Sequence, residues 1–402
     1  MAITACPFCF RKIDSSRLAY QCAGRGNVEC KKSEDEARVK LTGIKLETFP
    51  TFLPEPKGGV IPGANRSGSV NCPTCGGPAR RRACPQCHTA LPIDFVDSKS
   101  PMIGLVGAKG SGKTVLMTVL VKQLREMVGL RFGADIRIAT DNPDGHQGVS
   151  DYQTSREVPL YSNRTLPSGT QQQGSASRLR TTPVVLRWRQ EMTRLMRGQS
   201  LQSTVLSFVD TAGEDLNDLG TAFTLEYLSV CDALMITLDP FALPGARARL
   251  NLPEQAIQVG DDVPLDVVSR ITELLRTEHK VKNKKKIKLP VAIVFTKVDA
   301  FYPSLDRQNP IMARPAGIPA YEDADGQNVH EHMLALMHEW NAADIDTHMR
   351  LNYSDYRYFG VSALGAEPDY AGGVVAPGGV QPHRVEDPVL WLLSKTGTVS
   401  AA

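Results

Sequence analysis

Short apolar runs alternate with helix-like stretches in the part of the chain beyond residue 100. The runs at 101–107, 203–209 and 290–295 are rich in apolar and β-branched residues, as in strands that a sheet buries. The first run is followed by 113–129, which has the length and composition of a helix packed on a sheet. This alternation predicts an α/β fold with a mostly parallel sheet covered by helices.

The first hundred residues lack this alternation. A stretch rich in Pro, Gly and Ser, with no hydrophobic period, predicts an extended linker at 48–70. We therefore divide the chain into a cysteine-containing module at 1–47, the linker, a second cysteine-containing module at 71–98 and an α/β domain at 99–402. A long polar insertion is predicted in that domain at about 135–181, and its composition suits a segment that orders only with a ligand.

The composition is that of a soluble globular protein, with 42% hydrophobic and 22% charged residues in 402. No apolar run approaches the ~20 residues that a membrane helix needs. The first residues also lack the charged-then-apolar layout of a signal peptide. We therefore expect a cytoplasmic protein without a membrane span.

Cysteine usage indicates metal binding, because eight of nine cysteines lie before residue 90 and nothing suggests disulfides or a redox pair. Residues 72–87 hold two Cys-x-x-Cys knuckles separated by eight residues, which can aim four thiolates at one tetrahedral Zn²⁺. Residues 6–30 hold one knuckle and two single cysteines, which predicts a second site, although the sites could interleave. The predicted zinc ligands are Cys6, Cys9, Cys22, Cys30, Cys72, Cys75, Cys84 and Cys87. Cys231 lies alone in an apolar run.

A zinc ribbon can contact protein, RNA or DNA, or replace a core that is too small to fold alone. Arg80, Arg81 and Arg82 between the knuckles make a nucleic-acid contact conceivable. No aromatic residues interleave with these arginines, as a base-stacking surface would require. We therefore favour a protein partner or a structural role. The basic run at 280–288 could contact a membrane or nucleic acid, but we interpret it as a solvated loop.

The stretch "GLVGAKGSGKT" at 104–114 lies between a predicted strand and a predicted helix, the context of a phosphate-binding loop. Gly107 and Gly112 permit the tight turn, Lys113 reaches the outer phosphates, and Thr114 would ligate Mg²⁺. Successive backbone N–H groups of the loop face the phosphates. The predicted phosphate-binding residues are Gly107, Ala108, Lys109, Gly110, Ser111, Gly112, Lys113 and Thr114.

Two further positions are predicted to act on the phosphate side. The run at 203–209 ends in Asp210, whose carboxylate at the strand's C-terminal edge would hold Mg²⁺ directly or through water. Gly213 follows three residues later, where its backbone N–H would contact the γ-phosphate of a nucleoside triphosphate.

The base is predicted from two other strand ends. The run at 290–295 is followed by Thr296, Lys297 and, two residues on, Asp299. The Asp299 carboxylate can accept hydrogen bonds from guanine N1–H and the 2-amino group, a pair of donors that adenine lacks. The Lys297 stem can lie along the ring face, while Thr296 ties the turn back to the phosphate loop. Ser362 and Ala363 follow another apolar run, and the Ala363 N–H could meet guanine O6. The predicted ligand is GTP or GDP.

In order along the chain, "GAKGSGKT", "DTAGE", "TKVD" and "SAL" resemble the motifs of the translation-factor-related class of P-loop GTPases over about residues 101–395. The resemblance implies a Ras-like, doubly wound sheet, GTP, Mg²⁺ and hydrolysis of GTP to GDP and phosphate. Cysteine-knuckle modules ahead of such a domain, together with the closing "RVEDPVLWLL", also resemble the double-GTPase proteins proposed to act in bacterial conflict systems. That resemblance implies a conflict, defence or signalling role with an unknown protein partner, which could be another GTPase.

Three positions depart from the pattern of the class. Glu214 stands where many small GTPases place a water-orienting Gln, and its charge beside a γ-phosphate leads us to expect slow turnover. Lys109 stands where Ras-like switches usually have Gly; it could obstruct an arginine finger, replace its charge, or point to solvent. Gly110 replaces the Asn of potassium-stimulated GTPases, so we do not expect that activation. Lys113, Glu214, Gly213, Lys109 and Thr170 form the predicted catalytic set.

Thr170 is predicted to complete the Mg²⁺ ligands with Thr114 and Asp210, and Thr181 and Thr182 are its rivals. One of the arginines of the insertion could act in cis on the transition state; these are Arg156, Arg164, Arg178 and Arg180. Two other functions stay open. One is a zinc-ribbon nucleic-acid-binding protein gated by GTP, and the other is a nucleotide-binding scaffold without turnover.

Overall fold

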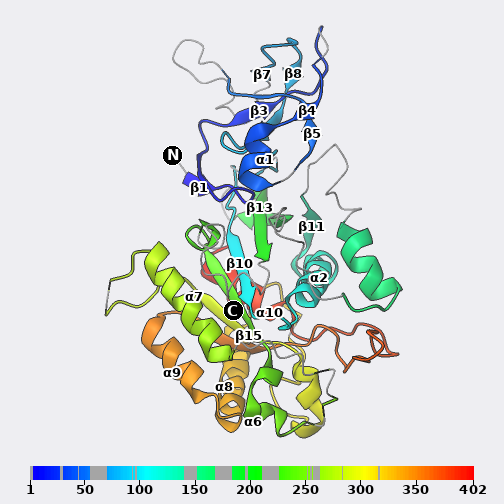
Figure 1. Ribbon diagram of the computed structural model, residues 1–402, viewed down its shortest axis with the longest axis vertical. Helices are drawn as coiled ribbons and strands as arrows, with labels where there is room; N and C mark the ends of the chain where they lie inside the picture. The colour runs from blue at the N-terminus through cyan, green and yellow to red at the C-terminus, as the bar shows by residue number, and fades with distance from the viewer. Residues whose placement is uncertain are drawn as a thin grey trace. The chain divides into compact units, whose positions relative to one another are not determined.

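The structure is a computed structural model (Figure 1). It describes residues 3–27, 30–43, 45–54, 70–92, 94–95, 97–139, 152–167, 183–194, 198–210, 226–250, 252–253, 256, 263–282, 284–315 and 317–402. The chain divides into two compact units. The first comprises residues 1–100, 137–151 and 172–207, and the second comprises residues 101–136, 152–171 and 208–402.

Four parallel strands form the centre of the second unit. In sheet order they are β10 (Met102–Gly107), β14 (Ala233–Leu238), β15 (Val291–Phe295) and β16 (Tyr356–Gly360). Every residue of β10, β14 and β15 is buried, as expected for parallel strands covered on both faces. Because the strands are parallel, their C-terminal ends lie along one edge of the sheet.

Within the part of the chain that the structure describes, the sheet has seven strands in the order β11-β12-β13-β10-β14-β15-β16. Its other members are β11 (Ala134–Ile138), β12 (Val184–Arg194) and β13 (Gly198–Asp210). This parallel-rich sheet confirms the predicted α/β class.

Helices flank the sheet in the second unit (Figure 1). The main ones are α2 (Lys113–Gln123), which continues through η1 (Leu124–Val128) and α3 (Gly129–Phe132), then α7 (Pro264–Glu278), α8 (Asp323–Glu339), α9 (Ala343–Asn352) and α10 (Asp387–Lys395). The edge strand β16 is covered by α8, since the Tyr358 N–H donates to His330 Nδ1 at 3.0 Å. Within the described residues, no helix has the length and apolar character needed to cross a bilayer.

Small antiparallel strands build the N-terminal part of the first unit. They are β1 (Ile3–Ala5) with β2 (Lys12–Asp14), β4 (Ser33–Glu34) with β5 (Glu47–Thr48), β7 (Val70–Asn71) with β8 (Pro78–Ala79), and the three-stranded sheet β6 (Thr51–Phe52), β3 (Ala19–Gln21) and β9 (Arg81–Ala83). One helix, α1 (Glu36–Thr42), follows β4. Strand β3 pairs with β9, so the two cysteine-containing segments share backbone hydrogen bonds. The domain boundaries stay a prediction.

The predicted polar insertion contains regular structure that its composition did not suggest. Strand β11 occupies its start, and a helical segment, η2 (Gln153–Ser162), lies further along. Leu160 is fully buried, and Glu157 forms an ion pair with Arg125 of η1. The buried Leu160 and this ion pair therefore help to hold the segment in place. A single buried apolar residue and a single ion pair do not produce a hydrophobic period in the sequence.

Candidate functional site

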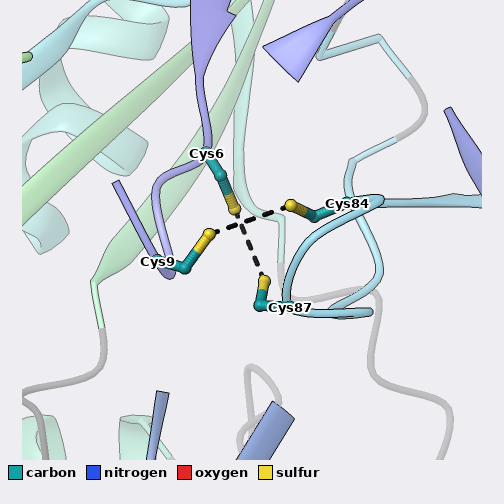
Figure 2. A group of neighbouring side chains, drawn as sticks. All are labelled: Cys6, Cys9, Cys84 and Cys87. Carbon is teal, nitrogen blue, oxygen red and sulfur yellow. Dashed lines mark hydrogen bonds between the residues drawn. The ribbon is translucent and has the colours of Figure 1, made fainter. Parts of the chain in front are cut away.

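The eight N-terminal cysteines form two clusters of four buried side chains. In the first, Cys6 Sγ lies 3.8 Å from Cys87 Sγ, and Cys9 Sγ lies 3.8 Å from Cys84 Sγ (Figure 2). In the second, the distance is 3.5 Å between Cys22 and Cys75 Sγ and 3.9 Å between Cys30 and Cys72 Sγ. Within each cluster all sulfur atoms lie within 4.8 Å of one another.

These distances fit a metal ion and not disulfides. A disulfide would bring two sulfur atoms to about 2.05 Å. Four thiolates placed tetrahedrally at ~2.3 Å from Zn²⁺ stand about 3.8 Å apart, which matches the spacing in both clusters. Cysteine-only sites of this kind are structural zinc sites, in which the metal contributes directly to folding.

The three Cys-x-x-Cys knuckles share one backbone turn. In each, the N–H of the residue after the second cysteine donates to the carbonyl of the first: Phe10 to Cys6, Gly76 to Cys72, and His88 to Cys84. The donor residue is left-handed in every case, with φ of 59° at Phe10, 71° at Gly76 and 56° at His88. This turn directs both sulfur atoms of a knuckle to the same side, as Figure 2 shows for Cys84 and Cys87.

The pairing of the knuckles corrects the expectation that 72–87 binds a single ion. Knuckle Cys84–Cys87 joins knuckle Cys6–Cys9, whereas knuckle Cys72–Cys75 joins Cys22 and Cys30. The reason is the chain between the two knuckles, which forms strands β8 and β9. Extended chain rises ~3.3 Å per residue, so eight residues keep the two knuckles apart. Each site therefore takes ligands from both cysteine-containing segments, an arrangement that the spacing left open. In chain order, the four ligands of the second site lie between the two knuckles of the first.

The phosphate loop connects β10 to α2 in the second unit. Gly110 and Gly112 have φ of 79° and 78°, which favours glycine at both positions. Gly107 is required for space, because a Cβ there would lie 2.1 Å from Thr237 Oγ1. The buried Lys113 ammonium donates to the carbonyls of Gly107 at 2.7 Å and Ala108 at 2.8 Å. Its charge therefore lies inside the loop, at the N-terminus of α2, where an anion is favoured.

The other loop residues differ in exposure. Ser111 is buried, and its Oγ lies 2.9 Å from Thr237 Oγ1. Thr114 is half-buried in the first turn of α2. Lys109 and Gly110 are exposed at the tip of the loop, and Ala108 is half-buried.

Three side chains after β15 lie at the same edge of the sheet as this loop. Thr296 Oγ1 donates to the Ser111 carbonyl at 2.9 Å, which ties the turn to the phosphate loop. Lys297 is left-handed, with φ of 57°, and begins the 3₁₀ segment η6 (Val298–Ser304), which holds Asp299. The structure thus brings the phosphate-side and base-side residues together at one sheet edge.

Asp299 is half-buried and hydrogen-bonds with Ser362. Burial raises the pKa of Asp299, while a hydrogen bond with Ser362 and the charge of Lys297 act in the opposite direction. Ser362 is fully buried after β16 and also accepts a hydrogen bond from the Gly365 N–H at 2.7 Å. Ala363 is half-buried beside it. A desolvated carboxylate of this kind gains most from a ligand that donates two hydrogen bonds to it.

Two residues that the sequence analysis missed hold Lys297. Asp239 Oδ2 accepts from Lys297 Nζ at 2.6 Å, and Nζ lies 5.0 Å from the centroid of the Phe241 ring. Both follow β14, where Asp239 caps the 3₁₀ segment η4 (Pro240–Ala242) through the Phe241 N–H. The available signal was an acidic residue directly after an apolar run, the same signal that singled out Asp210.

The Mg²⁺ ligands and the catalytic set are only partly described. Asp210 ends β13, and its backbone is described but its side chain is not. The remaining predicted residues lie outside the described residues; they are Thr170, Gly213 and Glu214, with the rivals Thr181 and Thr182 and the arginines Arg178 and Arg180. Of the other two arginines, Arg156 is exposed and Arg164 donates to the Pro377 carbonyl at 3.0 Å.

The chain is similar over nearly its whole length to one curated protein. This is the putative ESX-1 scaffolding and assembly protein SaeC of Mycolicibacterium smegmatis, which is 25% identical over 429 residues, 99% of this chain and 100% of that protein. No protein-family model matches the chain.

Solved structures that are similar include two nucleotide-bound GTPase domains. One is the Ski7 GTPase-like domain of S. cerevisiae with GDP and inorganic phosphate, at 12% identity over 75% of this chain and 50% of that one, with a TM-score of 0.35. The other is the small GTPase Arl6 of Trypanosoma brucei, at 13% identity over 75% of this chain and 100% of that one, with a TM-score of 0.26. At these TM-scores the alignments add no argument, so the assignment of the fold rests on the strand order and loop geometry described above. By those features, the chain combines a parallel-rich α/β sheet, with a glycine-containing loop that leads from β10 into α2, with two four-cysteine sites that fit zinc.

Proposed function

We propose that this chain is a GTP-binding switch that hydrolyses GTP slowly with Mg²⁺ and whose zinc modules contact a protein partner. One observation carries the nucleotide part of the proposal. The half-buried Asp299 stands on a turn that is hydrogen-bonded, through Thr296, to the loop that encloses the Lys113 ammonium. A hydrogen bond therefore links the turn that would bind the base to the loop that would bind the phosphates.

Guanine fits this arrangement better than adenine. The Asp299 carboxylate is an acceptor, and guanine offers it N1–H and an amino group side by side, whereas adenine offers it no such pair of donors. Leaving a buried charged group without its partner disfavours the wrong ligand strongly, which is how such sites reach high selectivity. The backbone N–H of Ala363, next to the Ser362 that contacts Asp299, is available for guanine O6.

Hydrolysis is the finer part of the proposal. Mg²⁺ bound by Thr114, Asp210 and Thr170 would neutralise charge that develops on the phosphates. Lys113 would bind the β- and γ-phosphates, and Glu214 would orient or deprotonate the attacking water. Because a second negative charge beside the γ-phosphate is repulsive, we propose that turnover without an activator is slow.

Single-turnover hydrolysis by the purified chain tests this function. We expect Mg²⁺-dependent release of phosphate from GTP and none from ATP, with a lower rate for Glu214→Ala. Glu191→Ala removes an exposed glutamate of β12, is the matched control and should keep the wild-type rate. GTP binding without release of phosphate would instead favour the non-hydrolysing scaffold, and equal binding of ATP would refute the role of Asp299.

A scaffolding or assembly role with a protein partner is our proposal for the biological process. Similarity to SaeC over the full length of both chains supports it, because SaeC is named as a putative scaffolding and assembly protein. A role in a bacterial conflict system, with another GTPase as partner, is the alternative, and we place either role in the cytoplasm. Capture experiments with GDP-loaded and GTP-analogue-loaded protein should differ in the partner retained. Salt-sensitive retention on RNA or DNA would favour the nucleic-acid alternative.

A further inference from the structure

The segment after Ser362 and Ala363 contains a hydrogen-bonded hairpin. The Asp369 N–H donates to the Val374 carbonyl at 3.0 Å, and the Val374 N–H donates to the Asp369 carbonyl at 3.2 Å. Asp369 Oδ1 also accepts from the N–H groups of Ala371 and Gly372 at 3.0 and 2.9 Å. We call residues 369–374 the hairpin; its turn carries Tyr370.

Both ends of the segment that holds the hairpin are fixed to the base-side residues. Ser362 and His383 exchange two backbone hydrogen bonds, at 3.1 and 2.8 Å, and the Gln381 N–H donates to the Leu364 carbonyl at 2.8 Å. Gly365 has φ of 82°, and a Cβ there would lie 1.9 Å from the Gln381 carbonyl oxygen, so the two ends of the segment touch at this point. The segment that holds the hairpin therefore begins and ends at Ser362 and its neighbours, and Ser362 contacts Asp299.

The Tyr370 side chain lies among the acidic groups of the base side. It is half-buried. Burial raises the pKa of Tyr370, and the negative charges of Asp299, Glu367 and Asp239 raise it further. Two of these three acids are the proposed base-reading carboxylate and the ion-pair partner of Lys297, so Tyr370 lies near the residues proposed to bind the base.

The hairpin also pairs with the segment that leads toward Thr170. The Leu166 N–H donates to the Gly373 carbonyl at 2.8 Å, and the Val375 N–H donates to the Arg164 carbonyl at 2.8 Å, which makes an antiparallel bridge between Thr165 and Val374. Arg164 lines one pocket together with Asp369 and Val374, the two bridged residues of the hairpin. Only Pro167 separates the bridged residues from 168–182, which contains the predicted Mg²⁺-ligating threonine.

We propose that the hairpin is a base-side clamp, in which Tyr370 contacts the guanine base beside Asp299 and the bridge to Arg164–Leu166 links occupation of the base pocket to the segment before Thr170. An aromatic ring suits this position because every purine presents a flat face for stacking, and the phenol adds no charge to an already acidic pocket. The inference rests on the proposed function, since it names a further residue and a coupling at the guanine-nucleotide site.

Dissociation of ribose-labelled fluorescent GDP from the full chain tests the contact. Tyr370→Ala should release GDP faster by about 5- to 150-fold, the range expected for loss of one base–aromatic contact. Tyr370→Phe keeps the ring and should stay close to wild type. Tyr356→Ala is the matched control, because Tyr356 is also half-buried but lies at the start of β16, opposite the strand end that leads to Ser362.

Amide hydrogen exchange tests the coupling. Saturating GDP should slow exchange at Leu166 and Val375, the two donors of the bridge, and this slowing should be lost in Tyr370→Ala at saturating GDP. Leu166→Pro removes one donor of the bridge and should abolish the GDP-dependent slowing at Val375 while Tyr370 is retained. The Tyr358 amide, which is paired with His330, should not respond to GDP in any variant.

The outcomes separate the two proposals. If the wild-type chain binds no guanine nucleotide, the proposed function fails and the clamp fails with it. If wild type binds GDP but Tyr370→Ala releases it at the wild-type rate, or if GDP leaves exchange at Leu166 and Val375 unchanged, the clamp alone is refuted.

Discussion

At the residue scale, the side chain with the largest consequence is Asp299. It is a half-buried carboxylate that hydrogen-bonds with Ser362 and is stabilised by the charge of Lys297. Burial makes the charged form costly, and a ligand with two adjacent donors compensates for that cost. Specificity for guanine and an unusual pKa are therefore two expressions of the same desolvated carboxylate.

The raised pKa of Asp299 predicts how GDP binding depends on pH. Guanine donates to the carboxylate form, so protonation of Asp299 competes with binding. Affinity should fall as pH decreases through the raised pKa, and thus at a higher pH than the ordinary aspartate value of ~3.9. Titration calorimetry between pH 8 and pH 5 measures this. Because the terminal phosphate also titrates near pH ~6, the same series with Asp299→Asn is the control. Identical pH profiles for both proteins would contradict the prediction.

At the element scale, local patterns predicted the chemistry of the knuckles but not their pairing. Each knuckle is a local turn, so its Cys-x-x-Cys spacing is visible in the sequence. The pairing depends on strand β9 lying beside β3, and these strands are only three residues long. Elements this short have no readable period, and their partners are fixed by tertiary contacts.

The zinc content of two double variants tests whether each site takes ligands from both cysteine-containing segments. Cys9→Ser with Cys84→Ser removes two ligands of one site, so we expect about one zinc ion per chain to remain. Cys9→Ser with Cys22→Ser damages both sites, so we expect almost none. Metal analysis of the purified proteins distinguishes these results. Pairing within each sequence segment would give the reverse order, and the two double variants control for each other because each loses two thiols.

The same distinction applies to the nucleotide site. The phosphate loop and the Thr296–Asp299 turn are predictable because each is a short motif at the end of a buried strand. Asp239, Phe241 and Tyr370 were missed because they act through contacts between loops that are distant in the sequence. The hairpin at 369–374 is not predictable from a local motif, because its turn is rich in glycine and its two bridged residues are too few to show an alternating pattern.

At the scale of the whole molecule, the parallel strand order explains why residues more than 180 apart meet. Parallel strands bring their C-terminal ends to one edge of the sheet, which puts the end of β15 beside the loop after β10. The sequence predicts this convergence once the fold class is known. It does not predict which segment of the long insertion returns to the site, because that depends on pairings such as the bridge between Thr165 and Val374.

Exchange of the base tests the central claim, that this fold binds guanine nucleotide through Asp299. Asparagine at this position offers an amide donor in place of one acceptor, which suits xanthine, whose C2 carries a carbonyl instead of an amino group. Calorimetry with GDP, ADP and xanthosine diphosphate should give wild-type protein that prefers GDP and an Asp299→Asn variant that prefers xanthosine diphosphate. Asp306→Asn, an exposed turn residue, should behave as wild type. Wild-type protein that binds ADP as well as GDP, or a variant with unchanged preference, would contradict the account.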